Sequence, residues 1–228
     1  MREIVFDTET TGLDPSTGDR MVEIGCIEMV NRVATGESFH AYFNPERDMP
    51  AGAEAVHGLS AAFLSDKPLF RDTVAALLDF IGDSPLVAHN AAFDFGFLNA
   101  ELAICEREAV CLTRMVDTVA IARKRHPGAK LSLDALCSRY GVDRSHRVKH
   151  GALLDAELLA QVYVELTGGR QIGLELAAET ASVDIAAAPR RAPADRIPRA
   201  PRPHLASEEE LARHRAFIGR MTTPLWGG

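Results

Sequence analysis

The first 170 residues alternate between short apolar runs and longer segments in which apolar residues recur with helical spacing. The short runs, bounded by turn residues, predict strands at 3–8, 21–31, 38–44 and 85–89. The longer segments predict helices at 72–82, 91–105, 117–125, 132–140 and 151–167. The early strands follow one another through turns, whereas the later strands are separated by helices. This order predicts a mixed α/β sandwich whose first strands are antiparallel.

The pattern changes after residue 170. Residues 188–203 contain five Pro, five Arg and one Asp, a composition that cannot bury a core and predicts an extended, flexible linker. Ser207 is followed by three Glu, which indicates a helix start, and the single Trp of the chain is Trp226. A short amphipathic segment with an aromatic anchor is typical of a partner-binding tag. The alternative is an unstructured terminus.

Length and composition indicate an ordinary globular protein. The chain has 228 residues, enough for one domain of about 170 residues and a tail. It contains 46% apolar residues, and no apolar run approaches the roughly 20 residues of a membrane span. The N-terminal segment lacks a secretory leader, and the four cysteines form no CxxC pair. We therefore expect reduced thiols in a cytoplasmic protein, with neither a disulfide framework nor a zinc site.

The net charge of −7 is unevenly distributed. Residues 1–170 hold 17 Lys and Arg against 25 Asp and Glu. A domain this acidic is expected to lack the broad basic surface that drives salt-dependent nucleic-acid binding. If the protein handles nucleic acid, cations in a site must screen the phosphates, or a partner must hold the substrate.

Two acids end the first predicted strand. Asp7 and Glu9 follow the apolar residues 4–6, and side chains alternate across a strand, so the two carboxylates share a face. Each raises the pKa of the other, and a divalent cation such as Mg²⁺ or Mn²⁺ would remove that penalty. Taken alone, the pair is better explained as two solvated residues at a turn.

Further acids lie in apolar sequence. Asp94 follows Asn90 by four residues, and Asp155 lies among leucines. His150 precedes Asp155 by five residues, about 140° of helix rotation, so we expect it on the segment that enters the helix. Singly, Asp94 could be a helix-start acid and His150 a solvent residue. Together, the acids predict ligands for two metal ions, with His150 as the base.

Three segments carry a family resemblance. FDTETTG (6–12), HNAAFDFGFL (89–98) and HGALLDAELLAQVY (150–163) resemble the motifs of the DEDDh 3′→5′ exonucleases, in the required order. Within this family, VHGLS (56–60) and SLDALCSRYGV (132–142) resemble the proofreading epsilon subunits of bacterial DNA polymerase III. The resemblance covers residues 2–170. It implies an RNase H-like exonuclease fold with a mixed five-stranded sheet flanked by helices, and a catalytic domain over 1–170.

The resemblance also assigns roles. Asp7, Glu9 and Asp155 would bind the first metal ion, Asp7 and Asp94 the second, and His150 would take the proton from the attacking water. The metals would be two Mg²⁺ or Mn²⁺ ions, and the product a nucleoside 5′-monophosphate removed from a mispaired DNA 3′ end. Residues expected to contact the terminal nucleotide, besides Asp7, Glu9 and Asp155, are Thr10, Thr11, Gly12, Leu13, His57, Asn90 and Phe93.

The same resemblance suggests partners. QIGLEL (171–176) resembles a sliding-clamp-binding motif anchored by Gln171, Leu174 and Leu176, although Gly173 and Glu175 depart from it. The alternative is a frayed extension of the last helix. After a linker over 177–206, residues 207–228 with Phe217 and Trp226 would bind the polymerase alpha subunit. A small third core subunit is also suggested.

Other functions are compatible with parts of this pattern. The motifs do not separate DNA from RNA, so a DEDDh enzyme acting on RNA or on other DNA ends is one alternative. A non-catalytic scaffold in the clamp–polymerase complex is another, although all five catalytic positions are filled. A metal-binding regulatory module fits less well, because it would not need His150.

Overall fold

The computed structural model describes residues 1–145, 147, 149–169 and 205–221. The chain divides into two units, 1–176 and 177–228. The clamp-motif segment 171–176 and residues 177–204 of the expected linker lie outside the described residues, so the domain boundaries remain predictions. No helix in the described ranges is long and apolar enough to cross a membrane.

The first unit is built on a five-stranded sheet with the order β3-β2-β1-β4-β5. Its strands are β1 (Arg2–Thr10), β2 (Met21–Val30), β3 (Val33–Tyr42), β4 (Leu86–Ala88) and β5 (Met115–Asp117). β1, β2 and β3 pair antiparallel, whereas β4 pairs parallel with both β1 and β5. The predicted mixed five-stranded sheet with an antiparallel first part is therefore confirmed.

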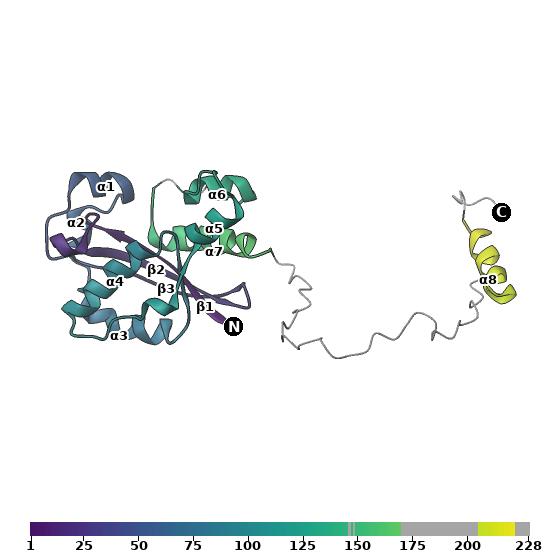
Figure 1. Ribbon diagram of the computed structural model, residues 1–228, viewed down its shortest axis with the longest axis horizontal. Coiled ribbons are helices and arrows are strands. Elements are labelled where there is room, and N and C mark those ends of the chain that lie inside the picture. Colours follow the sequence, from purple (N-terminus) through teal and green to yellow (C-terminus); the bar gives the residue numbers. More distant parts are fainter. Residues whose placement is uncertain (146, 148, 170–204, 222–228) are drawn as a thin grey trace, which may run out of the picture. The chain divides into compact units, whose positions relative to one another are not determined.

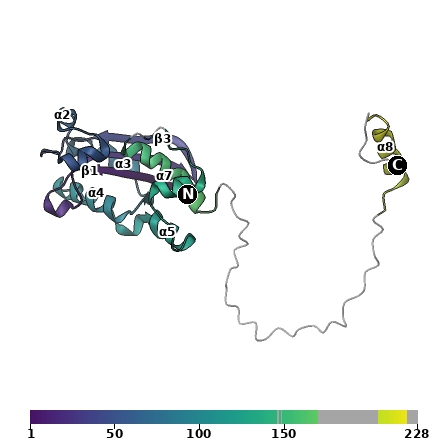
Figure 2. The same cartoon turned by 90° about the horizontal axis from the view of Figure 1, so that it is seen from above.

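Helices cover both faces of this sheet. They are α1 (Ala51–His57), α2 (Ala61–Leu64), α3 (Phe70–Ile81), α4 (Ala92–Ile104), α5 (Thr118–Arg125), α6 (Leu133–Tyr140) and α7 (Ala152–Leu166), with 3₁₀ turns η1 (Pro15–Thr17) and η2 (Leu112–Arg114). Ile4 and Phe6 of β1 join a core with α3 and α4, whereas Val5 joins a core with α7. The alternating side chains of β1 thus belong to two separate cores. Figure 1 shows the helices arranged around the strands. In the view from above, α4 and α5 lie on the side of β1 away from β3 (Figure 2).

The sequence missed several elements. β3 begins at Val33, five residues before the predicted start, because Asn31 and Arg32 in left-handed conformation form a tight turn after β2. Residues 33–37 are exposed and carry no apolar alternation, so their pairing left no signal. The short helices α1 and α2 and the three-residue strand β5 were also not predicted, because they are too short for a periodic pattern.

The second unit contains α8 (Glu208–Ile218). Ser207 caps it: its hydroxyl accepts from the Glu210 backbone N–H, while the Glu210 carboxylate accepts from the Ser207 backbone N–H. The helix start predicted at Ser207 is therefore confirmed. Phe217 is 60% exposed, which leaves an aromatic side chain available for contact.

Candidate active site

The end of β1 carries the first two acids. Asp7 and Glu9 alternate with residues of the α3–α4 core and point to the α7 face of the sheet. The β1–β2 register shifts between Glu9 and Thr10, and such an irregularity re-aims side chains at a strand end. The chain therefore leaves the sheet directly after placing both carboxylates beside α7.

A glycine brings α7 to these acids. Gly25 of β2 lies opposite Asp7 in the register. A Cβ added to Gly25 would lie 2.3 Å from the backbone of Leu153, in the first turn of α7. Because Gly25 has no side chain, α7 starts directly against the sheet, and this contact brings Asp155, 3% exposed, next to Asp7 and Glu9.

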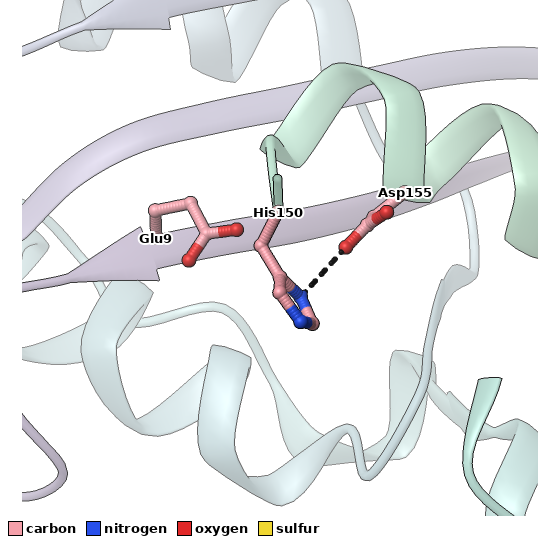
Figure 3. A group of neighbouring side chains, drawn as sticks. All are labelled: Glu9, His150 and Asp155. Carbon is pink, nitrogen blue, oxygen red and sulfur yellow. Dashed lines mark hydrogen bonds and ion pairs between the residues drawn. The ribbon is translucent and has the colours of Figure 1, made fainter. Parts of the chain in front are cut away.

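Glu9, His150 and Asp155 converge. One potential ligand atom from each lies within 4.8 Å of the other two. His150 lies two residues before the first residue of α7, and its Nδ1 is 3.2 Å from Oδ2 of Asp155 (Figure 3). The imidazole is 48% exposed, whereas both carboxylates are buried. The group thus consists of two buried carboxylates and one half-exposed imidazole.

Asp94 reaches the site from the other face. It lies in the first turn of α4, is 3% exposed, and accepts a hydrogen bond of 2.7 Å from the hydroxyl of Thr8. Thr8 points away from Asp7 and Glu9 along β1, toward α4. Residues 7–9 of β1 therefore lie between Asp94 of α4 and Asp155 of α7, which come from opposite faces of the sheet. Sequence reasoning missed Thr8, since its role depends on the position of α4.

The electrostatics of the site show mutual repulsion. Burial raises the pKa of Asp7 well above its ordinary value, and Asp94, Glu9, Asp155 and Glu23 raise it further. Burial, followed by the charge of Glu23, raises the pKa of Glu9 to about 8. Burial also raises the pKa of Asp94 to about 7, against the hydrogen bond from Thr8. These carboxyls therefore lack sufficient positive charge from the protein itself.

Two charged residues of the site were not predicted. Glu23 lies opposite Glu9 in the β1–β2 register, is 2% exposed, and pairs with Nε2 of His40 at 2.7 Å. Arg147 donates to both carboxylate oxygens of Asp155, at 2.5 and 2.6 Å, and to Asp134 at 2.7 Å. An acid inside the apolar run 21–29 is a signal that could have revealed Glu23. No pattern marked Arg147.

The predicted nucleotide-contacting residues lie around the end of β1 and the helices beside it. Thr10 and Thr11 are buried, and Leu13 is 84% exposed. Gly12 leaves no room for a side chain, because a Cβ there would lie 2.1 Å from the Asp19 carboxylate. Leu13 is therefore an exposed apolar side chain four residues after Glu9.

His57, Asn90 and Phe93 come from other segments. His57 ends α1 and is 6% exposed; its Nδ1 accepts from the backbone N–H of Leu59, while its Nε2 is buried without a hydrogen-bond partner among the described residues. Asn90 precedes α4 in left-handed conformation, with φ 64°. Phe93 is half-buried, with its ring 5.0 Å from that of Phe97. Of the predicted partner-binding residues, Gln171, Leu174, Leu176 and Trp226 lie outside the described residues.

The donor set determines what the site can hold. Clustered, buried carboxylates with raised pKa values are stabilised by hard divalent cations, which prefer oxygen ligands. A nearby imidazole can accept a proton at neutral pH. The arrangement is therefore suited to metal-assisted hydrolysis of a phosphodiester.

Comparison with known proteins supports the same chemistry. An exonuclease family model matches residues 4–163. DNA polymerase III subunit epsilon of Rickettsia conorii is 48% identical over 225 residues, which cover 97% of this chain and 96% of that protein. The Escherichia coli K12 protein of the same name is 46% identical, over 74% of this chain and 72% of its own length.

Solved structures show the fold. Exonuclease X in complex with 5′-overhanging duplex DNA matches with a TM-score of 0.57 at 24% identity, over 72% of this chain and 90% of that one. The nuclease domain of 3′hExo, described as a DEDDh family member bound to rAMP, matches with a TM-score of 0.63 at 15% identity, over 73% of this chain and 91% of that one. With the matched family model and the close relatives, the chain belongs to the 3′→5′ exonuclease family and, within it, to the DNA polymerase III epsilon subunits.

Proposed function

We propose that this enzyme removes mispaired nucleotides from DNA 3′ ends as nucleoside 5′-monophosphates and so proofreads replication. The observation that carries the proposal is the convergence of Glu9, His150 and Asp155 within 4.8 Å, beside Asp7, in a chain of the epsilon family. A frayed end would enter a site for single strands at lower cost than a paired end. Selection for mismatches would then need no recognition of the wrong base.

The acids fit divalent metal ions. The exonuclease family depends on such ions. We assign two ions, Mg²⁺ or Mn²⁺, to Asp7, Glu9, Asp94 and Asp155. The raised pKa values of Asp7, Glu9 and Asp94 reflect negative charge that the protein's own cations do not balance. When bound, the ions would neutralise the carboxylates and stabilise charge on the phosphodiester in the transition state. Asp94 would be held in place for this role by Thr8.

His150 is assigned as the general base. Its half-exposed ring is oriented by Asp155, which lies 3.2 Å from Nδ1. The imidazole would take a proton from the attacking water as the new P–O bond forms and the P–O3′ bond breaks. The departing 3′-oxygen then takes up a proton. No side chain needs to act as the nucleophile.

We assign the terminal nucleotide to the loop after β1. Thr10, Thr11, Gly12 and Leu13 would contact it, with Leu13 offering an exposed apolar surface to the base. His57, whose buried Nε2 has no hydrogen-bond partner among the described residues, would supply a polar contact. Asn90 and Phe93, at the start of α4, would line the same region.

The relatives' name points to a place in the polymerase III core. We propose that residues 207–228, with Phe217 and Trp226, bind the alpha subunit through the linker 177–206, and that Gln171, Leu174 and Leu176 bind the sliding clamp. A small third core subunit would bind the catalytic domain. The enzyme would act in the cytoplasm, consistent with four unpaired cysteines.

Two experiments test the proposed partners. Truncation after residue 185 should abolish copurification of alpha but keep nuclease activity. The double substitution Gln171→Ala with Leu174→Ala should weaken clamp binding.

The primary test uses 5′-labelled single-stranded DNA with Mg²⁺ or Mn²⁺, beside Asp7→Ala and a chelator control. We expect stepwise shortening from the 3′ end that the variant and the chelator both abolish. RNA of the same sequence runs in parallel. Shortening of RNA alone would assign the site to RNA ends, and no shortening of either by folded, metal-loaded protein would favour a scaffold.

A further inference from the structure

Positive charge is concentrated in one segment of the acidic catalytic unit. Residues 123–149 hold eight Lys and Arg but only two acids, Asp134 and Asp143. The rest of residues 1–170 holds nine Lys and Arg against 23 Asp and Glu. The expectation that this domain lacks a broad basic surface, based on its total charge, therefore does not describe this segment.

The fold gathers these cations on two neighbouring helices. α5 and α6 share a core with α7 through Ala122, Leu136 and Leu158, and the three helices lie together in Figure 1. His126, just after α5, is 2.6 Å through Nε2 from the hydroxyl of Tyr140, the last residue of α6. Residues at the ends of α5 and α6 are thereby held side by side.

Most of these cations form no ion pair among the described residues. We define the α5–α6 basic surface as Arg123, Lys124, Arg125, Lys130 and Arg139, all exposed. None of the five forms an ion pair within the part of the chain that the structure describes. Partial desolvation lowers the pKa of His126, and the charges of Arg139 and Arg125 lower it further, which places both guanidinium groups near one imidazole.

The surface lies along α7 from the active site. Arg125 donates a hydrogen bond of 3.0 Å to the carbonyl oxygen of Leu166, eleven residues and therefore about 16 Å along α7 from Asp155. Arg147 bridges Asp155 of the site and Asp134 in the first turn of α6, and Arg144 also pairs with Asp134 at 2.9 Å. On the other side of His150, the Lys149 side chain lies over Gly58, at the end of α1, where an added Cβ would be 2.6 Å from its Cδ. Arg144 and Arg147, between the site and α6, are thus paired with acids, and the α5–α6 basic surface begins beyond them.

We propose that the α5–α6 basic surface binds the phosphates of the DNA strand that leads to the 3′-terminal nucleotide in the site. This proposal rests on the proposed function, because it assumes a nucleic-acid substrate. The roughly 16 Å along α7 between Asp155 and Arg125 is the length of about four to five stacked nucleotides, so the surface would meet phosphates upstream of the terminal nucleotide. Lys and Arg contacts to phosphate carry no sequence information, as a proofreading enzyme requires. An acidic protein partner is the alternative occupant.

The test uses the full-length chain with three alanine substitutions, Arg123→Ala, Lys124→Ala and Arg139→Ala. A matched control, Lys67→Ala, Arg71→Ala and Arg107→Ala, removes three positive charges beside or on α3 and α4. Substrates are the p-nitrophenyl ester of thymidine 5′-monophosphate, which fills the site alone, and a 12-nucleotide single strand. Both are assayed over a range of salt concentrations.

We expect the α5–α6 variant to hydrolyse the ester like the wild type but to raise KM for the 12-mer about tenfold. The slope of log kcat/KM against log salt should fall by about two, because each lost phosphate contact contributes about 0.7. Equal losses in the control variant, equal losses on the ester, or an unchanged 12-mer KM would each overturn the proposal. An unchanged KM with lost polymerase copurification would assign the surface to a protein. A wild type inactive on both substrates would instead refute the proposed function.

Discussion

Arg147 and Asp155 form a bidentate ion pair within the site, with Nε 2.5 Å from Oδ1 and Nη2 2.6 Å from Oδ2. Their side chains are 9% and 4% exposed. The same Nη2 lies 2.6 Å from Nδ1 of His150. Nδ1 also lies 3.2 Å from Oδ2 of Asp155; because a guanidinium only donates and a carboxylate only accepts, the tautomer of His150 determines which of the two Nδ1 hydrogen-bonds. Arg147 therefore engages both a predicted metal ligand and the predicted base.

Arg147→Ala should strengthen divalent metal binding. A metal ion and the guanidinium compete for the same oxygens of Asp155, so removal of Arg147 should lower the dissociation constant for Mn²⁺ about tenfold, or about 1.4 kcal/mol. In chelator, the same variant should unfold at a lower temperature, because Asp155 loses its counter-ion. Titration calorimetry and thermal unfolding measure the two effects.

Arg144→Ala is the matched control for that experiment, since Arg144 pairs only with Asp134 among the described residues and is 45% exposed. Its metal affinity should equal that of the wild type. Unchanged Mn²⁺ affinity in Arg147→Ala would show that Arg147 leaves Asp155 at no cost and does not compete with the metal.

The pH dependence of stability should follow from the raised pKa values. The pKa of Glu9 is about 8 and that of Asp94 about 7, against about 4 in an unfolded chain. Between about pH 4 and 8 the folded protein therefore binds more protons, and stability in chelator should fall as pH rises, by at most about 1.4 kcal/mol per pH unit for each group. Urea unfolding from pH 5 to 8.5 measures this slope.

Added Mg²⁺ and charge-removing variants identify which groups cause the fall of stability with pH. Saturating Mg²⁺ should reduce it, because the ion binds the ionised carboxylates of the folded state. Glu9→Gln should reduce the slope, although Asp7 and Asp94 still contribute to it, whereas Glu37→Gln, at an exposed residue of β3, should leave it unchanged. A wild type whose stability in chelator rises between pH 5 and 8 would contradict the assigned pKa directions.

The sequence predicted those site residues whose signal is local. Asp7 and Glu9 share a face because strands have period two, and Asp155 lies among leucines that must be buried. Thr8 and Arg147 gave no such signal, because each acts through a residue brought near by tertiary structure, Asp94 and Asp155 respectively. Glu23 is an acid in an apolar run, but its place opposite Glu9 follows only from the strand register. Single-residue patterns cannot show contacts between distant segments.

The secondary structure was likewise predicted where its signal is local and missed where it depends on tertiary contacts. The long periodic helices were predicted nearly to the residue, as for α6 at 132–140 against the observed Leu133–Tyr140. β5, with three residues, is determined by parallel pairing with β4 and has no pattern of its own. Gly25 looked like any strand glycine, and its role became apparent only when α7 was seen against it.

Gly25→Ala should disrupt the site. The added methyl group would overlap the backbone of Leu153, so α7 must shift, and Asp155 moves with it. Overpacking of this kind costs about 1–3 kcal/mol, and a displacement of about 1 Å can reduce the rate about 100-fold. Urea unfolding and kcat on the nucleotide ester measure the two effects. Gly96→Ala, in α4 with open space around it, should retain wild-type activity. Wild-type kcat in Gly25→Ala would show that the position of α7 is not critical.

His150→Ala should separate the role of base from that of ligand. The imidazole lies close enough to Glu9 and Asp155 to join them around one ion, so its proximity alone allows either role. As the base, it should contribute about 10²–10⁴ to kcat, while the Mn²⁺ dissociation constant stays near that of the wild type. As a ligand, its loss should weaken metal binding as strongly as Glu9→Gln does. Calorimetric titration of Mn²⁺ into His150→Ala, beside Glu9→Gln, decides between them, and a strongly weakened affinity in His150→Ala would reassign the residue to the metal.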